Sequence, residues 1–224
     1  MGWIPFWPRT SALSGESVNT LFIAELIVCA AILVLVFGLI WVFCIRYRRG
    51  NPVSRSGPEA KSWVVEIAWT SGTLFAFLLL FDWGAEIYVW LYKPPPADLE
   101  LYVVGKQWMW KVEHPGGQRE IDELHVPVGR NVRLVLASQD VIHSFFIPAF
   151  RLKHDVVPGT LETMWFRPTA TGSFALLCAE FCGTQHAHMD GQVVVMEPAA
   201  YADWLANQGV SQSLVRISSR VVSA

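Results

Sequence analysis

One uncharged stretch constrains the fold of this chain more than any other feature. Every residue from Leu26 to Ile45 lacks a charge, and an α-helix of about 20 such residues crosses the hydrocarbon core of a bilayer. Isoleucine, leucine and valine are so dense there that no polar face separates from an apolar one, as it would in a surface helix. The composition agrees, because 53% of the 224 residues are hydrophobic and only 16% are charged. We therefore predict a first transmembrane helix over residues 21–45.

The charges around this helix predict its orientation. Five basic residues follow it in one short connection that glycines and prolines keep from being helical: Arg46, Arg48, Arg49, Arg55 and Lys61. A solvated loop would look the same, but beside a membrane span such an excess marks the cytoplasmic side. Both termini are then expected outside. Residues 1–20 lack the pattern of a removable signal peptide and are expected to form an extracytoplasmic segment, with Ser17 or Asn19 capping the helix.

A second hydrophobic stretch, residues 63–92, predicts a helix that returns across the membrane and completes a hairpin over residues 21–92. It carries Glu66 at its inner end and Asp82 and Glu86 near its outer end. Charges at membrane depth are costly, so these side chains are expected to face a protein partner or water. Three consecutive prolines then end the helix and begin a linker over residues 93–98.

Beyond the linker the hydrophobic pattern changes to the alternation of β-strands. Short segments of this kind are separated by glycine, proline or charged turns: 99–104, 107–113, 121–126, 131–137, 160–166, 172–177 and 192–196. Several short strands with regular turns predict an all-β sandwich or barrel over residues 99–207, with a helix at 199–206 packed on it. The tail, residues 208–224, predicts no function.

One short segment of this all-β region concentrates metal-binding side chains. Cys178, Cys182, His186 and Met189 supply two thiols, an imidazole and a thioether, a set that suits copper better than calcium or magnesium. His143 is the candidate for a further histidine from upstream. Three interpretations are open at this point: two thiolates that bridge two copper ions, a disulfide between the two cysteines, or a zinc site.

The order of these residues resembles one known family. The segment Asp140-Val-Ile-His-Ser144, followed by Cys-x3-Cys-x3-His-x2-Met, is similar to subunit II of cytochrome c oxidase, which carries the binuclear CuA centre. The resemblance implies a cupredoxin-like Greek-key sandwich with the ligand loop between its last two strands and His143 on an earlier strand. It also implies two copper ions, bound by the side chains of His143, Cys178, Cys182, His186 and Met189 and by the backbone carbonyl of Glu180. The carboxylate of Glu180 would reach a magnesium ion shared with the catalytic subunit.

The same resemblance implies two further site residues. Glu66-Ile-Ala-Trp-Thr70 is similar to the family's Glu-x-x-Trp-Thr, whose glutamate stands at the mouth of a proton channel in the catalytic subunit, although Thr73 replaces a common proline. Trp108 matches the tryptophan that receives electrons, with Met109 where the family often has tyrosine. Without the resemblance, Glu66 is a helix-end carboxylate facing headgroups and Trp108 is a packing residue of the sandwich.

The resemblance therefore implies the electron-accepting subunit of a respiratory terminal oxidase. Electrons from cytochrome c would pass through CuA to haem in catalytic subunit I, where oxygen is reduced to water with proton translocation, among further membrane subunits. No haem is expected on this chain, which has no Cys-x-x-Cys-His, and its net charge of -2 gives no case for binding nucleic acid. The expected location is the lipid bilayer of a bacterial inner membrane or an equivalent energy-transducing membrane, with the sandwich on the periplasmic side.

Two other functions fit the same residues. A CuA subunit of a nitric oxide reductase would carry the same ligands, and the sequence does not distinguish oxygen from nitric oxide as the final acceptor. A membrane-anchored copper-handling protein would bind the metal without transferring electrons.

Overall fold

The structure is a computed structural model that describes residues 9–55 and 62–207. It divides into two compact units, a helical one from Val18 to Tyr88 and a second one that joins the residues up to Ser17 to those from Val89 onward. Part of the basic connection, including Lys61, and the tail at residues 208–224 lie outside the described residues.

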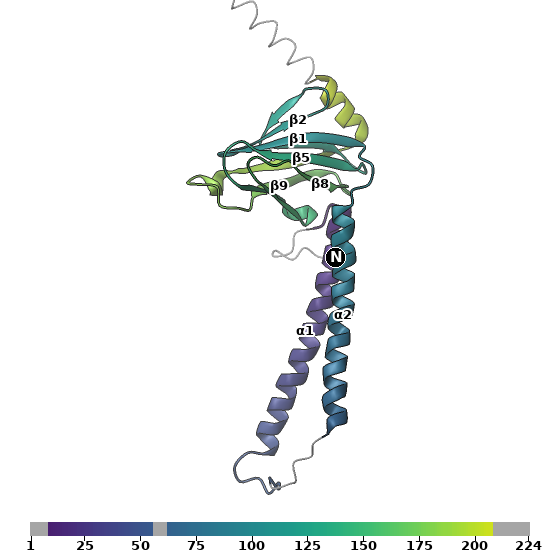
Figure 1. The fold of residues 1–224 in the computed structure, drawn as a ribbon, viewed down its shortest axis with the longest axis vertical. Helices are drawn as coiled ribbons and strands as arrows, with labels where there is room; N and C mark the ends of the chain where they lie inside the picture. Colours follow the sequence, from purple (N-terminus) through teal and green to yellow (C-terminus); the bar gives the residue numbers. More distant parts are fainter. Residues whose placement is uncertain (1–8, 56–61, 208–224) are drawn as a thin grey trace, which may run out of the picture. The chain divides into compact units, whose positions relative to one another are not determined.

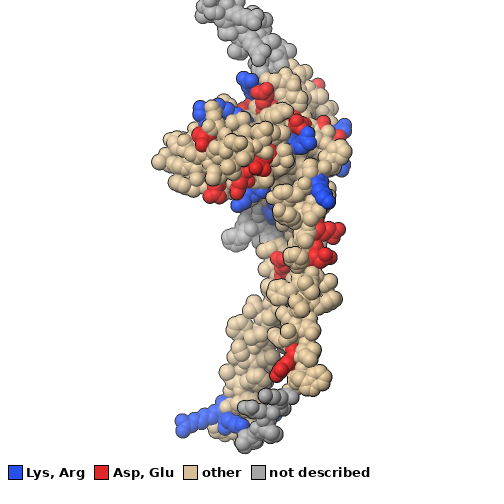
Figure 2. Space-filling view, in the orientation of Figure 1, with Lys and Arg blue, Asp and Glu red and all other residues tan. Residues whose placement is uncertain are grey.

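Two long antiparallel helices, α1 (Leu13–Arg46) and α2 (Trp63–Tyr92), form the helical unit and lie side by side (Figure 1). Both are long and apolar enough to cross a membrane. Along the hairpin the charged side chains on the visible face are scattered and acidic, whereas basic side chains gather at the end that carries the connection between the helices (Figure 2). The predicted helical hairpin is therefore confirmed.

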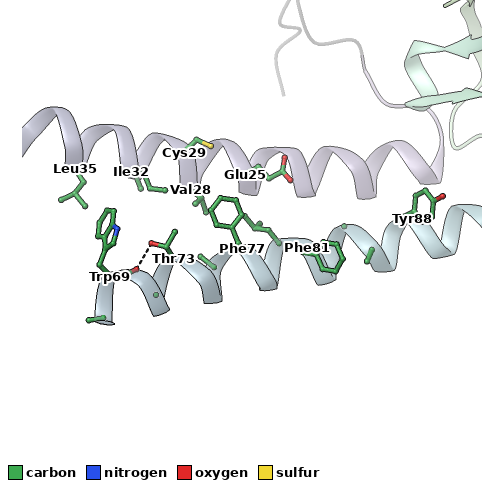
Figure 3. A pocket seen from close by; sticks show the side chains of 17 residues that line it. Glu25, Val28, Cys29, Ile32, Leu35, Trp69, Thr73, Phe77, Phe81 and Tyr88 are labelled. Atoms are coloured by element: carbon green, nitrogen blue, oxygen red, sulfur yellow. Dashed lines mark hydrogen bonds between the residues drawn. The ribbon is translucent and has the colours of Figure 1, made fainter. Parts of the chain in front are cut away.

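An apolar cavity of about 1180 Å³ lies between the two helices. Figure 3 shows Trp69 and Phe77 of α2 pointing toward α1, on which Glu25 is the charged residue of the lining. Thr73, which stands where the family commonly has proline, donates its hydroxyl to the Trp69 carbonyl at 2.8 Å. Threonine keeps the backbone N–H that proline lacks, so α2 runs through this position without a break.

The bounds predicted from the sequence are correct for one helix and not for the other. α2 has the predicted bounds, but α1 begins at Leu13 instead of residue 21. Ser17 and Asn19 lie inside α1, so the prediction that one of them caps the helix is wrong. The extra turns are polar by sequence, and contacts distant in the chain fix them.

These contacts join the start of α1 to the β-rich part of the second unit. Ala12 is fully buried and forms an antiparallel β-bridge with Pro168. The backbone N–H of Leu13 donates to the Arg167 carbonyl at 3.0 Å. The hydroxyl of Ser14 donates to the Phe150 carbonyl at 2.9 Å. Ala12 thus belongs to the core of the sandwich, and the first helical turn is fixed against it.

Ten strands make up the sandwich (Figure 1). They are β1 (Leu99–Lys106), β2 (Met109–Glu113), β3 (Arg119–Ile121), β4 (Glu123–Pro127), β5 (Val132–Ser138), β6 (His143–Ile147), β7 (Leu152–Val156), β8 (Glu162–Phe166), β9 (Gly172–Cys178) and β10 (Asp190–Met196). One sheet has the order β3-β2-β1-β5-β8 and the other β4-β10-β9-β6-β7. The pairs β1–β5 and β4–β10 are parallel and the other pairs are antiparallel. The predicted cupredoxin-like sandwich is confirmed.

The strand pattern in the sequence missed part of the second sheet. β7 and the short β3 were not predicted, and β6 was expected only as an unspecified strand that carries His143. Four of the five residues of β6 are buried, including three in succession. Because both faces of this strand are covered, its sequence does not show the alternation by which a half-buried strand is recognised.

A helix at residues 198–207 packs on the sandwich through a buried polar network. Glu120 accepts hydrogen bonds from the ring nitrogens of His114, at 2.6 Å, and of His125. The hydroxyl of Tyr201, on the helix, lies 2.9 Å from the other ring nitrogen of His114. The Trp204 ring stacks on His125 at 4.5 Å. The network therefore ties the predicted helix to β3 and β4.

Replacing Glu120 with glutamine is expected to destabilise the sandwich and to change its acid response. Burial alone would raise the pKa of Glu120, but the hydrogen bonds from His114 and His125 outweigh it and lower the pKa from 4.5 to about 2. A lowered pKa contributes stability above pH 4.5 that is lost as the pH falls toward 2. At neutral pH we expect the variant to lose about 2 to 3 kcal/mol of unfolding free energy.

Urea unfolding of the full chain, followed by tryptophan fluorescence between pH 7 and pH 3, measures this effect. Glu123→Gln is the matched control, because Glu123 is exposed and accepts a hydrogen bond from Gln192 at 2.8 Å. Equal stability of the Glu120→Gln and Glu123→Gln chains at neutral pH would contradict the role of the network.

Candidate metal centre

The candidate metal centre is built on the segment that follows β9. The ligand loop, residues 179–189, connects Cys178 at the end of β9 to the start of β10. β6 pairs antiparallel with β9, with Phe145 opposite Cys178. The backbone N–H of Ala179 donates to the Ser144 carbonyl at 3.0 Å. This register brings His143, at the start of β6, beside the loop, as the sequence predicted.

Two thiols and two imidazoles converge at this point. The Sγ atoms of Cys178 and Cys182 are 3.8 Å apart. Nδ1 of His143 lies 4.0 Å from the sulfur of Cys178, and Nδ1 of His186 lies 3.5 Å from the sulfur of Cys182. Each cysteine thus has one histidine beside it.

Two further predicted ligands complete the cluster. Sδ of Met189 lies 3.7 Å from the sulfur of Cys182, and the carbonyl oxygen of Glu180 lies 3.3 Å from the sulfur of Cys178. Met189 and Cys182 are almost completely buried, whereas the Glu180 side chain is exposed. All six residues predicted to bind copper are therefore brought together, and they come from β6, β9 and one loop.

The geometry of the cluster fits a metal site, and Cys178 and Cys182 do not form the alternative disulfide. Both cysteines are free, since a disulfide needs about 2 Å between its sulfur atoms. A metal–thiolate bond is about 2.3 Å long, so two sulfurs 3.8 Å apart can both reach the same ion. The donor set of thiolate, imidazole and thioether is of the type that copper prefers.

The charged states of the surrounding groups are set by burial and hydrogen bonds. Burial, and then the neighbouring Cys178 thiol, raises the pKa of Cys182 to about 11. Burial alone would raise the pKa of Asp140, but hydrogen bonds from the Gln107 N–H and from His143 lower it. Nε2 of His143 donates to Asp140 at 2.8 Å, which leaves Nδ1 as the nitrogen available to a metal.

Trp108 lies against the ligand loop. It packs on the core, half-buried, in the turn between β1 and β2. A Cβ atom added to Gly183 would lie 3.3 Å from the Trp108 ring, so the ring and the residue after Cys182 are in close contact. Trp110, in contrast, is fully buried and meets the His143 ring at 5.8 Å.

The remaining predicted site residue lies elsewhere. Glu66 is exposed in the first turn of α2, in the helical unit, and its role at a proton channel stays a prediction. Sequence reasoning missed the hydrogen-bonding function of Asp140 and Gln107 around the ligands. Asp140 stands inside the quoted motif, and the signal that could have found it is its position three residues before His143; Gln107 directly precedes Trp108.

Comparisons with known proteins identify a family model and relatives that the chain resembles. The family model described as cytochrome C oxidase subunit II, periplasmic domain, matches residues 118–197. Over 145 residues the chain is 35% identical to the alternative cytochrome c oxidase subunit 2 of Bradyrhizobium diazoefficiens. This match covers 50% of this chain and 52% of the relative. Over 124 residues it is 41% identical to the cytochrome c oxidase subunit 2 of Thermostichus vulcanus. This match covers 55% of this chain and 38% of the relative. The chain thus matches about half or less of these curated relatives.

A solved structure matches the β-rich part of the chain. The periplasmic domain of subunit II of cytochrome oxidase from Bradyrhizobium japonicum is 33% identical, with a TM-score of 0.51. The match covers 53% of this chain and 99% of that domain.

Proposed function

Because the chain belongs to the family of cytochrome c oxidase subunit II, we propose that it is the electron-accepting subunit of a respiratory terminal oxidase with a CuA centre at its ligand loop. The observation that carries the proposal is the convergence of two thiols, two imidazole Nδ1 atoms, a thioether and the Glu180 carbonyl. Two copper ions held by these residues would supply a one-electron carrier.

The chain's own residues fit this task through rigidity and exclusion of water. Strand pairing holds His143, opposite Val156 in β7, and Cys178, opposite Phe145 in β6, so both side chains stand on regular secondary structure. His143, Cys182 and Met189 are buried, and a dry, fixed ligand shell tunes the potential of a metal site. The thiol protons of Cys178 and Cys182 leave to solvent when metal binds.

Electrons would reach the centre through Trp108, which is in contact with the residue after Cys182. We propose cytochrome c as the donor and haem in a catalytic partner subunit as the acceptor. Residues 98–197 contain twelve Asp and Glu against eight Lys and Arg. A modestly acidic domain favours association with a basic donor through electrostatic steering.

The helical unit would anchor the chain beside the catalytic subunit. α1 and α2 would span the membrane, with the basic connection on the cytoplasmic side and the sandwich and both termini on the periplasmic side. Glu66 would then stand at the mouth of a proton channel of that subunit. The exposed carboxylate of Glu180 is accessible to a magnesium ion shared with it.

Copper loading of the full-length chain in detergent tests the proposal. We expect two copper ions per chain and an electron paramagnetic resonance spectrum in which one unpaired electron is shared by two copper nuclei. Hyperfine structure from a single nucleus would exclude the binuclear centre. Purified, assembled complex with a Cys178–Cys182 cystine and no copper would contradict copper binding altogether.

A further inference from the structure

The turn between β1 and β2 contacts both segments that carry the proposed ligands. Gln107 is half-buried in this turn, directly before Trp108. Its side-chain amide donates to the backbone carbonyl of Cys182 at 2.8 Å. Its backbone N–H donates to the carboxylate of Asp140 at 2.8 Å. One residue thus contacts the ligand loop with its side chain and the segment before His143 with its backbone.

Asp140 extends this connection to a ligand. One of its carboxylate oxygens accepts the Gln107 N–H, and the other accepts Nε2–H of His143 at 2.8 Å. The backbone N–H of Val141 donates to the same carboxylate at 2.7 Å. A continuous series of hydrogen bonds therefore runs from the Cys182 carbonyl through Gln107 and Asp140 to the His143 ring.

The ligand loop is pressed closely onto this turn. Gly183 has a φ of 124°, a backbone conformation that side chains disfavour. A Cβ atom there would lie 2.9 Å from the Gln107 amide nitrogen and 3.3 Å from the Trp108 ring. Glycine is therefore required for the approach that lets Gln107 reach the Cys182 carbonyl.

We propose that Gln107 is a positioning residue for the ligand loop. Its amide holds the Cys182 end of the loop against the Trp108 turn, and its backbone N–H orients Asp140 and thereby His143. The part of this inference that concerns copper binding rests on the proposed function. Its structural consequence, restricted access to the Cys182 thiol, holds for the metal-free chain as well.

The first test uses the metal-free, full-length chain. We expect Gln107→Ala to increase the rate at which a maleimide labels Cys182, read by mass spectrometry of the Cys182 peptide, by about fivefold, the effect of losing one net hydrogen bond. Gln107→Met keeps the length of the side chain without its donor and is expected to behave like the alanine variant. Gln192→Ala is the control. Gln192 lies on β10, away from this turn, and its side chain is hydrogen-bonded to Ser173 and Glu123, so this variant is expected to be labelled at the wild-type rate.

The second test loads the same chains with copper and challenges them with a chelator. Loss of an outer partner of a ligand typically weakens metal binding by about 10- to 100-fold, and we expect about tenfold weaker retention in both Gln107 variants. Wild-type labelling and retention in the Gln107→Met chain would overturn the inference. Equal loosening in the Gln192→Ala chain would also overturn it, because the effect would then be general destabilisation.

The two proposals fail in different measurements. If the wild-type chain itself gives no two-copper spectrum, the proposed function is wrong, and the labelling rates still decide whether Gln107 positions the loop. If the spectrum is present and the Gln107 variants behave like wild type, only the positioning role is wrong.

Discussion

A Cys182→Ser chain is expected to lose the two-copper spectrum and to support no oxidation of cytochrome c in the assembled oxidase. The sulfur of Cys182 lies within 3.8 Å of the ligand atoms of Cys178, His186 and Met189. Serine supplies neither a soft thiolate nor a second bridging atom. We expect turnover to fall by at least about 100-fold, the upper end of the loss that even an outer partner of a ligand causes.

Turnover of the purified complex, together with its copper content, measures this effect. Cys44→Ser is the matched control, because Cys44 is exposed on α1 in the helical unit. If the Cys182→Ser complex assembles and still oxidises cytochrome c, the chain handles copper without transferring electrons. That result would replace the proposed function with the alternative of a copper-handling protein.

Replacing Trp108 with phenylalanine is expected to slow electron input while leaving the copper centre intact. The Trp108 ring touches the residue that follows Cys182 and is only half-buried, so it lies between a ligand and the surface. The smaller phenylalanine ring would not reach that contact. Because Trp108 supplies none of the six ligand atoms, the copper centre itself is expected to stay intact. We expect the rate of reduction by cytochrome c to fall by about tenfold or more, equivalent to about 1.4 kcal/mol in the barrier.

Stopped-flow reduction of the assembled oxidase by cytochrome c measures this rate, and the copper spectrum verifies the centre. Trp204→Phe is the matched control, because Trp204 lies on the helix at residues 198–207 and stacks on His125. Should the Trp108→Phe complex be reduced at the wild-type rate with a lower melting temperature, Trp108 is a packing residue only.

The parts of the fold that the sequence predicted depend on local patterns. The hairpin follows from two long apolar stretches, and most strands follow from alternation along a half-buried surface. The start of α1 could not be predicted, because the burial of Ala12 against Pro168 depends on residues far along the chain. β7 was missed for another reason: its burial alternates, but the polar His154 stands at its central inward position, so the alternation does not appear in the hydrophobicity of its sequence.

In the candidate site, too, the features that depend on local spacing were predicted and those that depend on distant contacts were not. Four of the predicted ligand side chains lie in one short segment, so their clustering alone indicated a metal site, and their donor types favoured copper. The sequence left a disulfide open, and the structure shows free cysteines. The connection from Gln107 to the Cys182 carbonyl spans 75 positions, and that from Gln107 to Asp140 spans 33. No local pattern specifies hydrogen bonds between segments so distant, and only the folded sandwich brings them together.

The burial of Ala12 makes the sandwich a discontinuous domain. Its core is closed by a residue that precedes the whole helical hairpin in the chain, through the bridge to Pro168 and the hydrogen bond from Ser14 to Phe150. A fragment cut at the proline linker would lack this closing turn and leave the Phe150 carbonyl without its hydrogen bond from Ser14. The sandwich can therefore reach its final form only once the segment around Ala12 has met the strands on either side of Pro168.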